Sequence, residues 1–176
     1  MQETQPNNME RPRILIVDDS PLNISVLVGL LKSDYKTLVA KDGEQAFNRV
    51  FSEQQPDLIL LDIMMPGIDG YEVCRQLKQD PRSRHIPIIF VSAMSEVGDE
   101  EKGLALGAVD YISKPFSPPI ILARIKTHLA LALQKRELER EVLRRTEELE
   151  RSRRGLIRRL GLAAEYKDNE TGLHVQ

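Results

Sequence analysis

Five short apolar runs alternate with amphipathic segments over the first 133 residues, and this alternation restricts the fold more than any other feature. The runs are Ile14–Val17, Thr37–Ala40, Leu58–Leu61, Ile86–Val91 and Tyr111–Ile112. They are far shorter than a membrane span and lack polar alternation, which is typical of strands buried on both faces of a parallel sheet. The sequence therefore predicts an α/β fold with a doubly wound, five-stranded parallel sheet.

The segments between these runs carry the signals of helices. Ser20 is a good N-cap and Pro21 suits the first helical position, which predicts a helix to about Ser33. Further helices are expected over 43–53, 70–79 and 96–106, where apolar residues recur three and four positions apart. In such a fold the ligand site lies at the carboxyl ends of the strands.

From Ser117 onward the pattern is that of one long helix. Four apolar residues in its first part are expected to pack on the sheet: Leu122, Ile125, Leu129 and Ala132. No helix breaker follows before Gly155. This part of the chain therefore predicts an α-helix that extends well beyond the sheet.

The later part of this helix carries the apolar seam of a coiled coil. The seam residues are spaced by four or seven: Leu138, Val142, Leu149 and Leu156. Arg145 and Ser152 interrupt the seam, so a solvated single helix remains an alternative to a parallel dimer. Glutamates and arginines spaced by four residues favour salt-bridged helix faces over a nucleic-acid patch.

The distribution of charge divides the chain into segments. Residues 1–133 hold 14 basic and 18 acidic residues, 134–160 hold 10 and 6, and 161–176 hold 1 and 3. We expect a flexible segment over 1–12, a compact domain over 13–133, a coiled-coil helix over 134–160 and the start of another domain over 161–176.

Composition excludes several classes of protein. The formal net charge of -2 gives no strong attraction to nucleic acid or to an anionic membrane, and no DNA-binding stripe is present. The single cysteine, Cys74, cannot form an intramolecular disulfide, and the three histidines have no zinc-site spacing. No signal peptide or transmembrane run is found, so we expect a cytoplasmic protein without a membrane partner.

Polar residues stand at the end of nearly every predicted strand. Asp18 and Asp19 end the first strand, Asp62 the third and Ser92 the fourth, and the fifth leads into Lys114. Clustered carboxylates repel one another unless a cation is bound, and hard oxygen ligands favour magnesium. A lysine and a hydroxyl beside that ion would bind phosphoryl oxygens, and one carboxylate would be free to act as a nucleophile.

The same residues occur in a known pattern. The stretches ILIVDDSPLN, DLILLDIMMPGIDGYEVCRQLK, IPIIFVSA and ALGAVDYISKPF follow one another between about Arg13 and Leu131. In order and spacing they resemble the flavodoxin-like receiver domain of two-component response regulators. The resemblance implies that Asp62 is the phosphoacceptor for a cognate sensor histidine kinase.

The resemblance also implies roles for the surrounding residues. Asp19 would be the main ligand of Mg2+ (or Mn2+), with Asp18 assisting through water and the backbone carbonyl of Met64 completing the protein ligands. Lys114 would pair with the phosphoryl oxygens, and Ser92 would hydrogen-bond one of them.

Switching is implied in the same way. A phosphoryl group would draw Ser92 inward, and Tyr111 would move into the vacated space. The surface of the fourth helix, fifth strand and fifth helix would then change, and a homodimer would form through this face and the coiled coil. Pro115 allows the cis peptide bond after Lys114 that the family shows.

The last sixteen residues, GLAAEYKDNETGLHVQ, resemble the opening of an HD-GYP phosphodiesterase domain. Glu170 and His174 match early metal-ligand positions of that family. Neither the HD doublet nor the GYP triplet occurs in the chain, so we expect no enzyme in this fragment. The resemblance implies the amino-terminal part of a longer regulator that would degrade cyclic di-GMP.

The sequence also leaves alternative functions open. One is a constitutive dimerisation module with degenerate phosphorylation, and another is a metal phosphodiesterase whose activity lies beyond Gln176. A haloacid-dehalogenase-like phosphatase would carry a DxD pattern, whereas Asp18 and Asp19 are adjacent and Ser20 follows. A flavodoxin-like cofactor binder would have a phosphate-binding loop in place of these two carboxylates.

Overall fold

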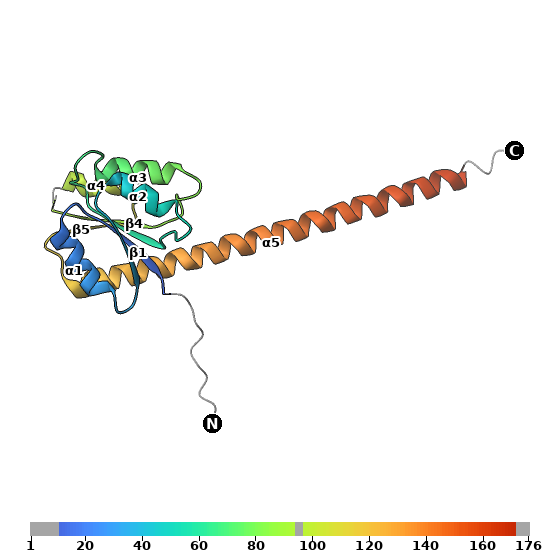
Figure 1. Ribbon diagram of the computed structural model, residues 1–176. Helices are drawn as coiled ribbons and strands as arrows, with labels where there is room; N and C mark the ends of the chain where they lie inside the picture. The colour runs from blue at the N-terminus through green and yellow to red at the C-terminus, as the bar shows by residue number, and fades with distance from the viewer. Residues whose placement is uncertain (1–10, 94–96, 172–176) are drawn as a thin grey trace, which may run out of the picture. The chain divides into compact units, whose positions relative to one another are not determined.

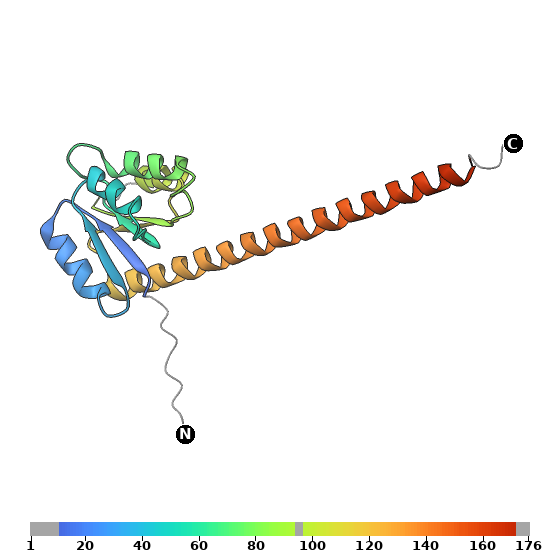
Figure 2. The same cartoon turned by 45° about the vertical axis from the view of Figure 1, so that its right-hand side comes forward.

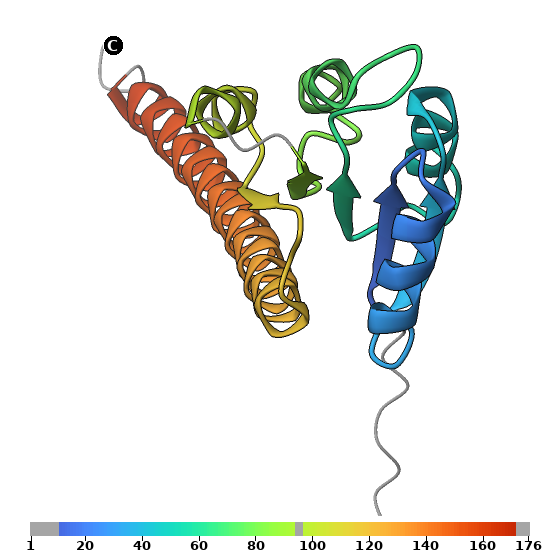
Figure 3. The same ribbon diagram turned by 90° about the vertical axis from the view of Figure 1, so that its left-hand side faces the viewer.

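The computed structural model describes residues 11–93 and 97–171, and a five-stranded parallel sheet forms the centre of the first part. The strands are β1 (Arg13–Val17), β2 (Lys36–Ala40), β3 (Leu58–Leu61), β4 (Ile88–Ser92) and β5 (Asp110–Ser113). Their order is β2-β1-β3-β4-β5, and all neighbouring pairs are parallel (Figures 1 and 3). The predicted fold class is therefore confirmed.

The helices follow the strands in alternation. They are α1 (Pro21–Leu31), α2 (Gly43–Val50), α3 (Gly70–Gln79), α4 (Val97–Ala105) and α5 (Pro118–Thr171). Helix α1 and the first turns of α5 cover one face of the sheet, and α2 and α3 cover the other (Figure 2). Because both faces are covered, β1, β3 and β4 are almost wholly buried, as their continuous apolar character requires, whereas the edge strands β2 and β5 are partly exposed.

The strand order places one pair of strand ends at the centre of the domain. Val17 at the end of β1 pairs with Leu61 at the end of β3. Strand β1 is connected outward to β2, whereas β3 continues the sheet in the other direction, so the order reverses between them. In doubly wound sheets this reversal opens a crevice for a ligand.

Several predicted boundaries differ from the observed ones by one to three residues. Helix α1 ends at Leu31 and not at Ser33, and α2 ends at Val50 and not at Glu53. Strand β4 begins at Ile88 and not at Ile86, because Pro87 has no N–H with which to join the ladder. Helix α3 occupies the predicted residues 70–79.

The packing of α5 on the sheet differs from the prediction at two residues, Ile121 and Ala132. Ile121 and Ile125 are fully buried, and Leu122 and Leu129 are only partly buried. Ile121 was missing from the predicted set, and Ala132, which belonged to it, is partly exposed. The buried stripe follows the four-residue spacing of 121, 125 and 129, which points one helical face at the sheet.

Helix α5 does not stop at Gly155 or at residue 160. It is continuous to Thr171. The chain divides into two compact units, of which the first ends at Ala132 and the second begins at Leu133. The proposed segment 161–176 thus begins inside this helix, while residues 172–176 and most of the proposed flexible segment 1–12 lie outside the described residues. Among the described helices, none combines the length and the apolar character that crossing a membrane requires.

The burial of α5 gives a test of the packing. Replacing Ile121, which is fully buried, with alanine should lower the free energy of unfolding by about 2–5 kcal/mol. The neighbouring Ile120 is 51% exposed, and Ile120→Ala should change the free energy of unfolding by about 0.5 kcal/mol or less. Urea denaturation of both variants measures the difference, and equal effects would contradict the observed orientation of the helix.

Candidate functional site

Two carboxylates lie side by side at the reversal point of the sheet. Asp18 follows β1 and Asp62 follows β3, and they are only 2% and 6% exposed. The ammonium of Lys114, just beyond β5, lies between them: its Nζ is 2.7 Å from Asp18 Oδ2 and 3.2 Å from Asp62 Oδ2. Like charges this close need a cation, and in this structure the lysine supplies it.

The Asp18 carboxylate is held in place by the start of α1. Its Oδ1 accepts a hydrogen bond from the backbone N–H of Ser20 at 2.8 Å. The Asn23 amide nitrogen donates to both carboxylate oxygens at 3.1 Å. Asn23 was not singled out from the sequence, although Ser20 as N-cap fixes its position on the first turn. Asp18 is thus fixed in orientation, with Lys114 on its remaining side.

The segment around Asp62 is pressed against the start of α3. The backbone N–H of Gly70 donates to the carbonyl of Ile63 at 2.9 Å. A Cβ atom at position 70 would lie 2.2 Å from the Asp62 carbonyl oxygen, so only glycine fits there. This close approach positions the loop that carries Asp62.

Asp19 completes a group of three carboxylates. One oxygen from each of Asp18, Asp19 and Asp62 lies within 4.8 Å of the others, and Asp19 is exposed. Oxygen ligands from carboxylates at this spacing, open to water on one side, fit a hard divalent ion that keeps several water ligands. The residues present therefore fit Mg2+, whereas no sulfur or imidazole ligand stands in the cluster to favour zinc.

The exposed position of Asp19 gives a test of the metal site. Asp19→Asn should weaken Mg2+ binding by about tenfold to 100-fold, because it removes one charged ligand from the cluster. Asp69→Asn is a matched control, because Asp69 caps α3 beside the same cavity and asparagine caps a helix equally well. Calorimetric titration measures both affinities, and an unchanged value for Asp19→Asn would remove it from the site.

Ser92 and Tyr111 are buried together behind the carboxylates. Ser92 is fully buried and Tyr111 is 7% exposed, and their side chains are hydrogen-bonded to each other. Burial raises the pKa of the Tyr111 hydroxyl, and the nearby Asp99 carboxylate adds to the increase. Tyr111 is thus buried next to Ser92 in this structure, and its movement on switching stays a prediction.

An aromatic row that the sequence did not reveal extends from Tyr111. The ring centroids of Tyr111 and Phe90 are 6.3 Å apart, and those of Phe90 and Tyr71 are 5.5 Å apart. Gly103 on α4 makes room for it, since a Cβ there would lie 2.8 Å from the Phe90 ring. The row joins α3, β4 and β5 behind the site.

The far end of this row borders an open cavity. The Tyr71 hydroxyl donates to the Asp99 carbonyl at 3.2 Å, and the Lys102 ammonium lies 4.1 Å from the ring centroid. Burial, followed by the Asp99 charge, raises the pKa of Tyr71 to about 12. The cavity, of about 740 Å³, is lined by Asp19, Ile63, Met64, Met65, Pro66, Asp69, Tyr71 and Lys102. It opens the edge of the carboxylate cluster to a small reactant.

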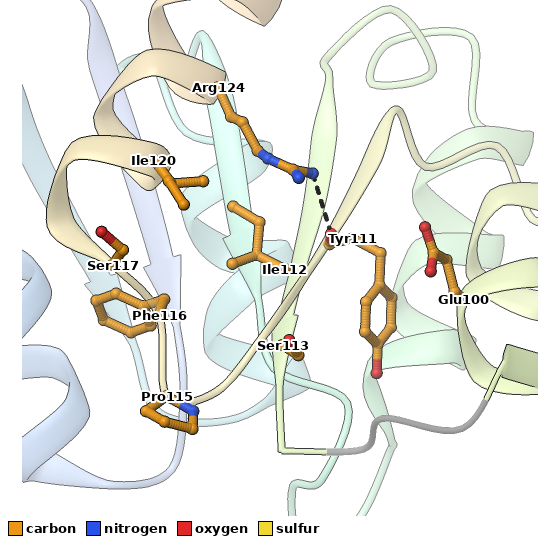
Figure 4. Close-up of a pocket in the computed structure, with 9 residues that line it drawn as sticks. All are labelled: Glu100, Tyr111, Ile112, Ser113, Pro115, Phe116, Ser117, Ile120 and Arg124. Atoms are coloured by element: carbon orange, nitrogen blue, oxygen red, sulfur yellow. Dashed lines mark hydrogen bonds between the residues drawn. The ribbon is translucent and has the colours of Figure 1, made fainter.

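A second cavity, of about 420 Å³, lies on the other side of Tyr111 (Figure 4). Arg124 crosses it and donates to the Tyr111 carbonyl at 3.3 Å. Its lining comes from α4, β5 and the start of α5: Glu100, Tyr111, Ile112, Ser113, Pro115, Phe116, Ser117, Ile120 and Arg124. Tyr111 thus lines this cavity and also lies next to Ser92.

The remaining predicted site residues fall in different places. Met64 is 62% exposed beside the cluster, and the peptide bond between Lys114 and Pro115 is cis. Glu170 lies in the last turn of α5, and His174 lies outside the described residues. The structure thus brings together Asp18, Asp19, Asp62 and Lys114, and places Ser92 and Tyr111 behind them.

Comparison with known proteins shows which family this chain matches. Residues 14–126 match the family described as the response regulator receiver domain. A probable cyclic di-GMP phosphodiesterase of Vibrio cholerae is 43% identical over 169 residues, which is 92% of this chain and 38% of that protein. The response regulator PleD of Caulobacter vibrioides is 42% identical over 65% of this chain and 25% of its own length. The chain thus spans well under half of either relative.

Solved structures show the same fold. A putative response regulator from Chloroflexus aurantiacus is 33% identical with a TM-score of 0.66, covering 69% of this chain and 99% of its own. The BeF3-activated receiver domain of RstA from Klebsiella pneumoniae is 35% identical with a TM-score of 0.61, covering 66% of this chain and 97% of its own.

Proposed function

The chain belongs to the response regulator receiver domain family, and from this premise we propose that it accepts a phosphoryl group on Asp62 from a sensor histidine kinase. One observation carries the proposal: the Asp62 carboxylate stands between a fixed cation, Lys114, and the open acidic cluster with Asp19. A receiver domain is a switch and not a turnover enzyme.

The chemistry follows from the position of Asp62. A carboxylate oxygen of Asp62 attacks the phosphorus of a phosphohistidine, the P–N bond breaks, and its electron pair returns to the imidazole nitrogen. When bound, Mg2+ supplies positive charge for the phosphoryl oxygens. Asp18 and Asp19 would hold it directly or through water, together with Asp62 and the backbone carbonyl of Met64.

Two further side chains would bind the oxygens of the phosphoryl group once it is on Asp62. Lys114 already contacts Asp62 at 3.2 Å and would transfer its contact to a phosphoryl oxygen. Ser92 is buried next to Tyr111 and would hydrogen-bond another oxygen. Because Tyr111 forms one wall of the cavity in Figure 4, a change at Ser92 alters the surface of α4, β5 and α5.

The output of the switch is proposed from the relatives. The Vibrio cholerae relative is named a probable cyclic di-GMP phosphodiesterase and matches 92% of this chain. We infer that phosphorylation controls a homodimer through the α4, β5 and α5 surface and the later part of α5. The dimer would in turn control a cyclic di-GMP phosphodiesterase domain, with Glu170 and His174 among its metal ligands.

A mass measurement tests the proposed function. The chain is incubated with Mg2+ and acetyl phosphate, which supplies the same phosphoryl group without a kinase, and its intact mass is recorded. We expect a gain of one phosphoryl group that hydroxylamine removes, as it does from an acyl phosphate. No gain from acetyl phosphate or from a phosphorylated histidine kinase would contradict the proposal.

One observation favours a second candidate, a constitutive dimerisation module. Tyr111 is 7% exposed and packs on Phe90, which is the arrangement that a permanent core residue would have. If this were the only state, light scattering would find the same dimer before and after phosphorylation. A change in assembly on phosphorylation excludes this alternative.

A further inference from the structure

Asp18 accepts hydrogen bonds on both of its carboxylate oxygens. Oδ1 accepts from the Ser20 backbone N–H at 2.8 Å and from the Asn23 amide at 3.1 Å. Oδ2 accepts from the same Asn23 amide at 3.1 Å and from the Lys114 ammonium at 2.7 Å. A carboxylate has about four acceptor sites, and these four contacts use all of them.

The other two carboxylates of the cluster are more open. Asp62 accepts one bond on each oxygen, from the Met64 backbone N–H at 3.4 Å and from Lys114 at 3.2 Å. Asp19 is exposed to water. Both therefore keep acceptor sites that can face an ion, whereas Asp18 would first have to break a bond.

The orientation of Asp18 depends on one side chain of α1. Asn23 is the third residue of this helix, and its backbone N–H donates to the Ser20 hydroxyl at 3.4 Å, so the first turn holds its backbone in place. Its amide spans both oxygens of Asp18, which prevents the carboxylate from turning. Asn23 thus holds Asp18 from one side while Lys114 contacts it from the other.

The number of carboxylates that are free to bind decides which divalent ion fits such a cluster. Mg2+ requires near-octahedral ligands at about 2.0–2.1 Å, keeps several water molecules and is bound by only one or two carboxylates. Ca2+ takes about 6–8 oxygen ligands at about 2.3–2.6 Å in a flexible geometry. Two open carboxylates therefore suit Mg2+, and a third would favour Ca2+.

We propose that Asn23 is a positioning residue that reserves Asp18 for Lys114 and thereby makes the cluster select Mg2+ over Ca2+. With the amide in place, Asp19 and Asp62 contact the ion directly and Asp18 contacts it through water. Without the amide, the Asp18 carboxylate turns and offers one oxygen as a third direct ligand. The inference rests on the proposed function, in which this cluster binds Mg2+.

The same arrangement maintains the position of Lys114. Its Nζ is 2.7 Å from Asp18 Oδ2 and 3.2 Å from Asp62 Oδ2, so Asp18 is the nearer of its two anchors. A carboxylate that turns toward an ion gives up this contact. Asn23 therefore preserves the lysine that would bind the phosphoryl group as well as the choice of ion.

Metal titration of the full chain tests the proposal. Mg2+ and Ca2+ are titrated separately into the wild type, Asn23→Ala and Ser25→Ala, and calorimetry gives each affinity. Because loss of a partner behind a metal ligand changes affinity by about 10–100-fold, we expect Asn23→Ala to lower the ratio of Mg2+ affinity to Ca2+ affinity by about tenfold. Ser25 is an exposed residue of the same helix, and Ser25→Ala should keep the wild-type ratio.

A second comparison separates positioning from a general effect on the fold. In an Asp18→Asn background there is no Asp18 carboxylate to release, so adding Asn23→Ala should change the ratio by less than about twofold. Asn23→Ser, whose side chain is too short to span both oxygens, should lower the ratio as Asn23→Ala does. Thermal denaturation without metal checks that each variant is folded.

Three outcomes contradict the proposal. An unchanged ratio in the folded Asn23 variants would show that Asn23 does not select the ion. An equal fall in the Asp18→Asn background would show that Asn23 does not act through Asp18. A wild type that prefers Ca2+, or that binds neither ion, would remove the selectivity itself.

Failure of the proposed function is seen separately, because the titrations need no phosphoryl donor. A chain that gains a phosphoryl group but keeps its ion preference in Asn23→Ala overturns only this inference. A chain that loses its Mg2+ preference in Asn23→Ala, yet gains no phosphoryl group, supports this inference and contradicts the proposed phosphoryl transfer.

Discussion

Asp62→Asn is expected to abolish phosphoryl uptake from acetyl phosphate, to below about one-thousandth of the wild-type rate, because an amide is not a nucleophile at this position. The change removes one of two buried carboxylates that share Lys114. The variant should therefore unfold at the same temperature as the wild type or at a higher one. Intact mass and thermal denaturation separate lost chemistry from a lost fold.

The control for this prediction lies in the same loop. Asp69 caps α3 through a 2.8 Å bond to the Glu72 N–H, and Asp69→Asn keeps a capping side chain. It should be phosphorylated at the wild-type rate. Persistent labelling of Asp62→Asn would show that another carboxylate is the acceptor, and peptide mapping would then identify it.

Lys114→Ala is expected to separate phosphorylation from its structural consequence. Lys114 is the cation that joins β5 to both buried carboxylates, and no other lysine or arginine bond to them is found among the described residues. Without it, Asp62 still reacts in the presence of Mg2+, but the phosphoryl group has no contact to β5. Light scattering of the phosphorylated variant should then find the assembly of the unphosphorylated protein.

The same variant predicts a change in the effect of magnesium. With Lys114 absent, Asp18 and Asp62 face each other without a cation, so Mg2+ should raise the melting temperature more than in the wild type. Lys126→Ala, which removes an exposed lysine from α5, should behave as the wild type. Normal coupling in Lys114→Ala, with an unchanged response to Mg2+, would remove Lys114 from the switch.

The sheet and the acidic cluster were predictable because each depends on a local pattern. The apolar run Leu58–Leu61 is typical of a buried strand, and α3 begins and ends where the spacing of its apolar residues predicts. Once the strands are parallel, Asp18 and Asp62 must meet at one edge, since they follow neighbouring strands. The grouping of these carboxylates therefore needed no knowledge of side-chain packing.

Other features depend on packing between distant segments, and the sequence alone does not reveal them. Asn23 can be placed on a helix, but its bonds to both Asp18 oxygens follow from the exact approach of α1. Ile121 and Leu122 are equally apolar, and only the direction in which α5 lies on the sheet selects Ile121 for the core. The row of Tyr71, Phe90 and Tyr111 joins residues from three elements.

The glycine behind this aromatic row has a consequence for the evolution of the domain. A Cβ at position 103 would lie 2.8 Å from the Phe90 ring and 3.7 Å from the Tyr111 ring. Positions 90 and 103 are therefore not free to vary independently: a larger residue at 103 needs a smaller one at 90. We expect these two positions to covary among relatives. In relatives without the glycine, we expect the Tyr111 position to pack differently and the response to phosphorylation to change with it.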